Sequence, residues 1–424
     1  MNYSLTKLKN GIRVIAVPIP GLSSATVTVW ANTGSRWEDK KIGGMSHFLE
    51  HMVFKGSKKR PTSKDIFGAV DAIGGEINAA TSKDWTNYYI KSRAPSLNEA
   101  FDVLSDMVLN PLLKQDEIDR EKGVIIEEIR MHDDTPMIKI SDLFENLVFS
   151  DTPLGRDIAG TEKTVGSVSR ADFLRYRTIH YYPENLIITV AGGVTKAEIL
   201  KLANKYFGAL TGKKNPGTYK KYSSTQKKPQ ILLWDKKKEQ AHFILGFRGE
   251  GRSYKNRYAE AVLATILGAS ASSRLFIEVR ERRGLCYFIK SSVERYMETG
   301  YFATQAGVDT KRVDEAIKVT LAEHYDLASG VKPISQKELK KAKEFLKGHI
   351  SLNLEDTREV CEFFGDQCLF LKEIITPRKV FERLDKVTIE QVLKEAKKLF
   401  RPERLNLALI GPYEDESRFR KLLK

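Results

Sequence analysis

The sequence predicts an α+β protein built from two related domains. The chain has 424 residues, more than the ~250–300 at which a single hydrophobic core stops growing. Strand-like and helical segments follow one another in the first half, and much of their order returns in the second. Hydrophobic residues make up 41% and charged residues 29% of the chain, as in ordinary globular proteins. We therefore expect two domains of about 200 residues each.

In the first half, β-branched residues indicate strands, whereas capping residues and glycines mark the ends of helices. Thr62 or Ser63 can cap a helix that Gly74 and Gly75 end. The sequence predicts strands at 13–17 and 25–31, a helix at 43–55, a strand pair within 76–91, helices at 96–109 and 115–132, and a strand at 186–191.

A polar, basic stretch rich in Gly, Ser, Thr and Pro runs from residue 210 to residue 230 and has the composition of a linker. We therefore place one domain at 1–212, a basic linker at 213–229 and a second domain at 230–424. The second domain repeats the order of the first, with strands at 241–249, 287–293, 300–307 and 405–410 and helices at 258–267, 313–328 and 335–354.

Features of a membrane or secreted protein are missing from the sequence. No apolar run approaches the ~18–20 residues of a membrane-spanning helix. The first ten residues do not show a positive cap followed by a long apolar stretch, as a secretory signal would. Cys286, Cys361 and Cys368 indicate no disulfide framework. The sequence thus predicts a protein without a membrane segment that works in a reducing cytoplasm.

The net charge of +15 makes a basic nucleic-acid-binding protein one alternative function. However, the lysines are spread along the chain and often neighbour acids, as Lys337 neighbours Glu338. No nucleic-acid-binding motif accompanies them. We therefore interpret the basic residues as a solvated surface and expect no nucleic-acid partner.

The most informative stretch is His47-Phe48-Leu49-Glu50-His51, within the helix expected at 43–55. On a helix, residues 47, 50 and 51 share one face, so two imidazoles one turn apart can bind one Zn²⁺ ion. A carboxylate between them can reach a water at the metal and activate it. The alternative is a buried helix that carries two ordinary histidines. The pattern favours a catalytic zinc site.

A catalytic zinc site needs a third protein ligand and an open position. The helix expected at 115–132 offers Glu121, Glu127 and Glu128. Glu121 and Glu128 lie seven residues apart and share a face, whereas Glu127 points about 100° away. This spacing favours Glu128 as the ligand and Glu121 as a supporting acid. By itself it does not exclude the alternative that both glutamates lie on a solvated helix face. His132, one turn beyond Glu128, is close enough along the helix to approach the metal, but we interpret it as structural.

Four stretches resemble the pitrilysin family of inverted zinc peptidases. They are residues 47–54, 75–89 (GEINAATSKDWTNYY), 121–128 and 153–193. Within the last, PLGRDIAGTEKTV and YYPENLIITVAGGV look like the mitochondrial-processing-peptidase-like branch. The likeness covers nearly the whole chain. It implies two domains, each with a six-stranded, mostly antiparallel sheet that is covered by helices on one side.

The resemblance also assigns roles to residues of the first domain, which it implies is the zinc-binding peptidase domain. It implies that Glu128 completes a metal site with His47 and His51. Glu50 matches the general base that activates water, and Glu121 matches an acid that supports the ligands. The expected reaction is hydrolysis of a peptide bond by a metalloendopeptidase.

Further matches concern the substrate. Phe54 matches a residue that borders the pocket for the side chain just after the cleaved bond. Asn78 and Ala79 match positions that contact the substrate backbone as it adds to a strand edge. Arg280 and Tyr287, seven residues apart in the second domain, match a pair that the resemblance implies binds the substrate carbonyl or its oxyanion.

The resemblance implies a homodimer that closes around a chamber and hydrolyses unstructured peptides or removes leader and presequence segments. One zinc ion per chain is expected, because the second half has no His-x-x-Glu-His at its equivalent helix, 258–267. A catalytically silent structural subunit of a larger complex is the alternative that the family itself offers, although His47, Glu50 and His51 are all present.

Overall fold

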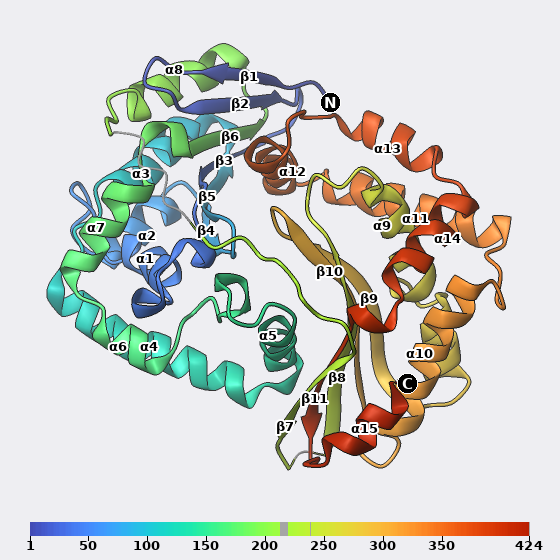
Figure 1. Cartoon of the computed structure of the whole chain (residues 1–424). Helices are drawn as coiled ribbons and strands as arrows, with labels where there is room; N and C mark the ends of the chain where they lie inside the picture. Colours follow the sequence, from blue (N-terminus) through green and yellow to red (C-terminus); the bar gives the residue numbers. More distant parts are fainter. Residues whose placement is uncertain (213–218, 238, 424) are drawn as a thin grey trace. The chain divides into compact units, whose positions relative to one another are not determined.

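The computed structural model of the chain describes residues 1–212, 219–237 and 239–423 (Figure 1). These residues form two compact units, each assembled from three stretches of the chain. Unit 1 consists of Met1–Arg130, Arg156–Lys220 and Ser351–Pro377, and unit 2 of Met131–Gly155, Lys221–Ile350 and Arg378–Lys424. Residues 213–218 of the predicted linker lie outside the described part of the chain.

Unit 1 is built on a six-stranded mixed sheet. Its strands are β1 (Ser4–Lys7), β2 (Arg13–Pro18), β3 (Ser24–Ala31), β4 (Glu76–Thr81), β5 (Thr86–Arg93) and β6 (Leu186–Gly192). They are ordered β1-β2-β6-β3-β5-β4, and only the neighbours β2 and β6 run parallel. β4 therefore forms one edge of this sheet, and a single strand of unit 1, β5, pairs with it.

One face of this sheet packs on α1 (Met45–Val53), α3 (Leu97–Leu109) and α8 (Lys196–Phe207). Their apolar sides, including Phe48, Phe101 and Phe207, join the strands in one buried cluster. Thr62 and Asp65 form a capping box at the start of α2, at one of the two cap positions expected. The other helices that begin in unit 1 are α2 (Ser63–Asp71), α4 (Gln115–Asp134), α6 (Glu162–Ser167) and α7 (Arg170–His180).

The opposite face of the unit 1 sheet is covered by α12 (Thr357–Phe370), a helix from the far end of the chain (Figure 1). Its Phe364 is buried in a cluster with Trp30 and Ile187. Gly365 lets α12 approach closely, because a Cβ at this position would lie 2.4 Å from a ring atom of Trp30. The sheet therefore has helices on both faces, whereas the resemblance implied helices on one side only.

Unit 2 is built on a five-stranded mixed sheet. Its strands are β7 (Gln230–Asp235), β8 (Gln240–Glu250), β9 (Cys286–Arg295), β10 (Thr299–Asp309) and β11 (Leu405–Gly411). They are ordered β7-β11-β8-β10-β9, with β7 and β11 parallel and the other neighbours antiparallel. This is the order and direction of β2-β6-β3-β5-β4 in unit 1, as a repeated domain requires.

The expected sixth strand is absent from the described part of unit 2, where nothing corresponds to β1. Residues 219–229, which precede β7, explain the difference, because they are mostly polar, rich in Lys and Ser, and end in Pro229. Such a stretch offers no alternating apolar face, and its proline cannot donate to a ladder. The prediction of six strands in each sheet is therefore wrong for the second sheet.

α5 (Pro136–Val148) covers one face of the unit 2 sheet (Figure 1). Its Phe144 lies against Gly246 of β8, where a Cβ would come within 2.5 Å of the ring. Helices α9 (Arg257–Gly268), α10 (Val313–Ser329) and α14 (Ile389–Leu399) also pack on strands of this sheet. The remaining helices are α11 (Gln336–Asn353), α13 (Pro377–Asp385) and α15 (Glu416–Leu422).

The predicted division at 213–229 separates the strands of the two sheets but not the helices that cover them. α5 comes from the first half of the chain and belongs to unit 2, and α12 comes from the second half and belongs to unit 1. Apolar periodicity indicates that each helix has a buried face, but it does not indicate which sheet buries that face. The α+β fold class with two sheets covered by helices is confirmed.

Candidate metal centre

The short helix α1 carries the three residues of the His-x-x-Glu-His pattern. Phe48 and Leu49 are buried in the core of unit 1 and fix which side of α1 faces inward. His47, Glu50 and His51 are half-buried on the other side, at the i, i+3 and i+4 positions that share a helix face. The core packing of α1 therefore presents both imidazoles and one carboxylate to the same region.

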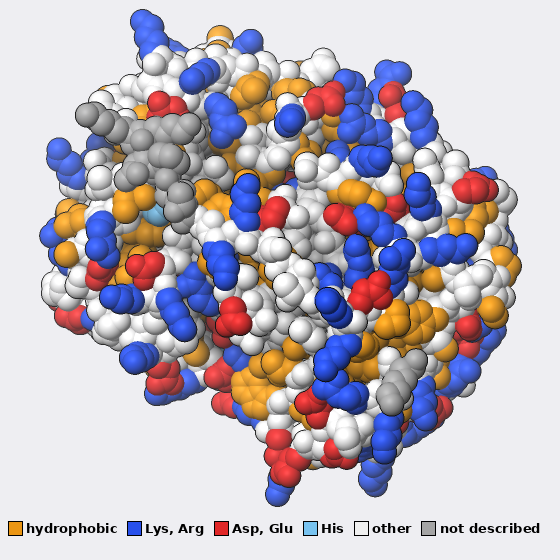
Figure 2. Space-filling model, in the orientation of Figure 1, with side chains coloured by type: hydrophobic (Ala, Val, Ile, Leu, Met, Phe, Trp, Pro, Cys, Tyr) orange, Lys and Arg blue, Asp and Glu red, His pale blue; other side chains and the backbone are white. Residues whose placement is uncertain are grey.

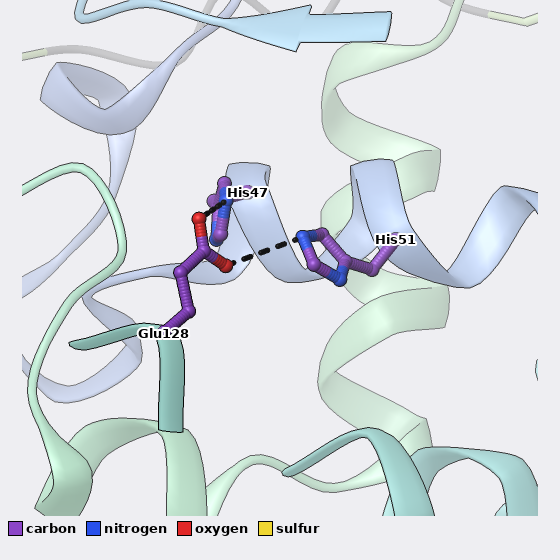
Figure 3. Close-up of side chains that lie close together, drawn as sticks. All are labelled: His47, His51 and Glu128. Carbon is purple, nitrogen blue, oxygen red and sulfur yellow. Dashed lines mark ion pairs between the residues drawn. The ribbon is translucent and has the colours of Figure 1, made fainter. Parts of the chain in front are cut away.

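His47, His51 and Glu128 of α4 face one another (Figure 3). Nε2 of His47 lies 3.5 Å from one carboxylate oxygen of Glu128, and Nε2 of His51 lies 3.6 Å from the other. Ligands of a tetrahedral ion with bonds of ~2.0–2.1 Å lie about 3.3 Å apart, so these separations fit one zinc ion. Across the described residues, this is the one cluster of His, Cys, Asp and Glu arranged to hold a metal.

Glu121 contacts His51 from α4. Its carboxylate accepts a hydrogen bond from Nδ1 of His51 at 2.9 Å and pairs with Lys55 at 2.7 Å. With Nδ1 engaged, Nε2 is the ring nitrogen of His51 that remains for a metal. Burial raises the pKa of Glu121, but the hydrogen bonds from His51 and Lys55 outweigh burial and hold that pKa below its usual value.

The neighbouring candidates on α4 lie apart from this group. The side chain of Glu127 is 71% exposed and pairs with Arg130 at 2.7 Å, whereas the side chain of Glu128 is 27% exposed. His132 does not belong to the group. Nδ1 of His47 is buried and has no hydrogen-bond partner within the described ranges. At metal sites a carboxylate commonly accepts a hydrogen bond from the second ring nitrogen of a histidine ligand. Among the described residues, such a carboxylate is found here for His51 and not for His47.

Glu50 lies between the two histidines and contacts the last residue of β4. The hydroxyl of Thr81 donates a hydrogen bond to its carboxylate. Burial raises the pKa of Glu50, and the hydrogen bond from Thr81 and the nearby histidines lower it by less. A carboxylate with a raised pKa beside a metal site is suited to take up and return a proton.

A cleft opens beside these groups. Phe54, which follows α1, and Phe67 of α2 line it with nearly parallel rings whose centres are 5.8 Å apart. Asn78 of the edge strand β4 lines the same cleft, and its side-chain oxygen accepts the N–H of Ala79 at 2.8 Å. The lining residues are Glu50, His51, Phe54, Lys55, Ser63, Phe67, Ile77, Asn78 and Glu121. The three predicted substrate contacts therefore lie in or beside a cleft that Glu50 and His51 also line.

The predicted Arg280 and Tyr287 lie close together in unit 2. Arg280 belongs to a π-helix at Phe276–Glu281, and Tyr287 follows in the edge strand β9. The guanidinium carbon of Arg280 lies 5.6 Å from the centre of the Tyr287 ring, and Tyr287 is 77% exposed. π-Helical turns are rare and are frequent at functional sites. A guanidinium and a phenol side by side offer several donors to a carbonyl oxygen.

Sequence reasoning missed three side chains at the site. Lys55 pairs with Glu121, Thr81 contacts the carboxylate between the two histidines, and Phe67 lines the cleft. Lys55 follows His51 by four residues, a spacing that could have identified it as a neighbour. Thr81 and Phe67 come from other elements and carry no such signal.

Two family models match the chain. The model described as Insulinase (Peptidase family M16) matches residues 13–162, and the one described as Peptidase M16 inactive domain matches residues 167–346. An uncharacterized zinc protease of Mycobacterium leprae is 34% identical over 421 residues, which cover 99% of this chain and 94% of that protein. An uncharacterized zinc protease of Bacillus subtilis is 36% identical over 408 residues, which cover 95% of this chain and 97% of that protein.

Solved structures share the fold. A protease from Helicobacter pylori superposes with a TM-score of 0.90 at 24% identity, over 97% of this chain and 100% of that one. A peptidase M16 inactive domain from Pseudomonas fluorescens has a TM-score of 0.90 at 18% identity, over 98% and 99%. The family models and the zinc-protease relatives confirm the pitrilysin-type family expected from the sequence, while the mitochondrial-processing-peptidase-like branch stays a prediction. The chain belongs to the insulinase family of zinc peptidases, peptidase family M16.

Proposed function

We propose that the protein is a zinc-dependent endopeptidase. The observation that carries the proposal is the meeting of His47, His51 and Glu128 at separations that fit one zinc ion, with Glu50 beside them on α1. The relatives called zinc proteases support the same chemistry. A catalytically silent structural subunit would have no use for a carboxylate placed between two metal-facing histidines.

Each residue at the site has a chemical role in this proposal. His47, His51 and Glu128 bind the ion, and Glu121 fixes the tautomer of His51 through its Nδ1. Zinc would supply Lewis acidity that polarises the scissile carbonyl and makes the attacking water more acidic. Glu50 takes the proton from the attacking water and passes it to the leaving amine.

The proposed substrates are extended peptides. β4 is an edge strand, so a peptide can add to residues 76–80 through main-chain hydrogen bonds that do not depend on its sequence. Asn78 and Ala79 belong to this strand. Phe54 and Phe67 give the adjoining cleft an apolar wall for the side chain next to the cleaved bond. Unstructured peptides and leader or presequence segments meet these requirements, whereas folded domains do not.

The proposal includes a homodimer in which Arg280 and Tyr287 of one subunit serve the zinc site of the other. Its support is the family resemblance, which implies dimers that close around a chamber. In that arrangement the donors of Arg280 and Tyr287 hold the substrate carbonyl while its bond is cleaved.

A metal and activity assay tests the proposal. We expect about one zinc ion per chain, cleavage of a quenched unstructured peptide, loss of cleavage on chelation and recovery when zinc returns. Glu128→Gln should lose metal and activity, whereas Glu127→Gln, which alters the exposed neighbour, should keep both. Cleavage by protein freed of metal, or full zinc in Glu128→Gln, would contradict the proposal.

A further inference from the structure

We infer that Glu38 is a positioning residue that sets the orientation of α1 and, through α1, of the metal-facing histidines. The inference rests on the function proposed above and gives a role to a residue outside the metal group. α1 has nine residues and carries His47, Glu50 and His51. A helix this short is marginal on its own, so the contacts that hold its N-terminus act together with its core packing to set where these side chains point.

The N-cap position of α1 cannot supply the usual side-chain acceptor. Gly44 occupies this position with a φ of 94°, in the left-handed region that favours glycine. A Cβ there would lie 2.4 Å from the carbonyl oxygen of Ala159. A Ser, Thr, Asp or Asn cap is therefore excluded, and the first N–H groups of α1 need an acceptor from another part of the chain.

Glu38 provides that acceptor from six residues before Gly44. One carboxylate oxygen accepts the N–H of Gly44 and the other accepts the N–H of Ser46, both at 2.7 Å. In its ionised form the carboxylate also places negative charge at the positive end of the α1 dipole. Glu38 is 4% exposed, and burying a carboxylate is costly unless its hydrogen bonds are made. Both of its oxygens are engaged by the start of α1.

Ser46 connects this anchor to the body of unit 1. Its hydroxyl lies 2.7 Å from the hydroxyl of Tyr176 on α7, which in turn lies 2.9 Å from the hydroxyl of Thr33. All three side chains are buried. Ser46 directly precedes His47, so a shift of the Ser46 backbone moves the first metal-facing imidazole. The carboxylate of Glu38 and this hydroxyl chain hold the same residue from two directions.

Glu38→Gln tests the inference. The amide keeps the size of the side chain but turns a donor toward one of the two helix N–H groups, which then loses its acceptor. We expect zinc affinity to fall ~10-fold or more, as for other groups that orient metal ligands. With cobalt in place of zinc, the visible absorption bands should shift because they report ligand geometry. At saturating zinc, kcat should fall while KM for peptide stays, because β4 is unchanged.

A second variant and a matched control keep the test decisive. Glu38→Asp retains the carboxylate but has a shorter side chain, so its cobalt bands should lie between those of wild type and Glu38→Gln. If Glu38→Gln does not fold, the cobalt bands of Glu38→Asp test the inference on their own. Glu260→Gln removes another buried carboxylate, which pairs with Arg295 in unit 2. This control should lose thermal stability and keep the zinc affinity and cobalt bands of wild type.

The outcomes separate the inference from the proposed function. Wild-type zinc affinity and cobalt bands in the Glu38 variants would overturn the inference and leave the peptidase proposal standing. Equal changes in Glu260→Gln would also overturn it, because a general loss of stability would then explain the result. Wild-type protein that binds neither metal would refute the proposed function together with the inference.

Discussion

At the residue scale, each ring nitrogen of His51 faces a carboxylate. Glu128 faces its Nε2 at 3.6 Å, and Glu121 accepts a hydrogen bond from its Nδ1 at 2.9 Å. A carboxylate at Nδ1 fixes the tautomer and makes Nε2 a better ligand. His47 has no such partner within the described residues, because its Nδ1 is buried without a hydrogen bond. The two proposed histidine ligands therefore differ in whether a carboxylate supports their Nδ1.

The effect of Glu121 on metal binding can be measured. Glu121→Gln weakens the hydrogen bond to His51 and removes the charge that pairs with Lys55, so zinc affinity should fall by ~10–100-fold. Asp119→Asn is the control, because Asp119 lies on α4 with an exposed side chain. Competition against a fluorescent chelator gives both affinities. Equal affinity in the two variants would exclude Glu121 from the support of the metal site.

Glu38 makes the stability of the protein depend on pH. Burial raises its pKa from 4.5 to about 7, although the hydrogen bonds from Ser46 and Gly44 lower it. Between these values the folded protein keeps a proton that the unfolded chain has released, so the contribution of this group to stability falls as pH rises. The total loss is about 3 kcal/mol.

Glu38→Gln removes this dependence. Relative to wild type, the free energy of unfolding of the variant should therefore rise between about pH 5 and about pH 8. Urea unfolding of metal-free proteins at both pH values measures the change. A difference between variant and wild type that stays constant with pH would show that the carboxyl group titrates normally in the folded protein.

At the scale of elements, each sheet has one face covered by a helix from the other half of the chain. α12 contacts Trp30 through Gly365, and α5 contacts Gly246 through Phe144. In both contacts a glycine leaves the space that a ring occupies. The two helices thus approach their sheets more closely than any side chain at these glycines would permit.

Gly365→Ala should therefore destabilise the protein. The new methyl group would lie 2.4 Å from Trp30 Cε2, and overpacking of a core typically costs ~1–3 kcal/mol. Gly348→Ala on α11 is the control, because nothing lies within 4 Å of its Cβ. Alanine in a helix there should stabilise by ~0.5–1 kcal/mol. Denaturant unfolding measures the stability of both variants. A Gly365→Ala variant as stable as wild type would contradict the close contact of α12.

The sequence predicts the elements that have local signals. α1 and α2 follow from apolar spacing and from the cap at Thr62, and the face that carries His47, Glu50 and His51 follows from helical geometry. The positions of α5 and α12 over the sheets cannot be predicted from the sequence in this way, because an apolar helix face does not indicate which sheet it packs on. Helices on both faces of a sheet are a tertiary arrangement that periodicity leaves open.

The candidate site likewise has features that the sequence predicts and features that it does not. Helical spacing favours Glu128 over Glu127, because it predicts which carboxylate shares a face with Glu121. The contact of Thr81 with Glu50 joins β4 to α1, and no spacing along the chain indicates it. Glu38 likewise reaches the start of α1 through a loop. These contacts arise only when separate elements meet.

At the scale of the whole molecule, the net charge of +15 comes from basic residues that are spread along the chain. Figure 2 shows acidic side chains interspersed among the basic ones over the visible face. This distribution agrees with the interpretation of a solvated surface, and the absence of a nucleic-acid partner stays a prediction. The cytoplasmic location also stays a prediction.

None of the described helices combines the length and the apolar character needed to cross a bilayer.

The proposed homodimer predicts complementation between inactive subunits. A subunit with Glu50→Gln and one with Arg280→Ala and Tyr287→Phe should each be inactive alone. After subunit exchange, half of the dimers are mixed, and each has one intact site of two. Activity should therefore recover to about one quarter of wild type. A tagged pull-down confirms exchange, and confirmed exchange without recovered activity would place both groups of residues in a single subunit.

In the proposed function, His47, His51 and Glu128 bind zinc for a reaction in which Glu50 moves the proton. Glu50→Gln tests it most directly, because it removes the base and leaves the three proposed ligands in place. We measure zinc content and peptide hydrolysis on the same sample. We expect about one zinc ion per chain with hydrolysis reduced ~10²-fold or more. Zinc retained together with near-wild-type hydrolysis would contradict this expectation.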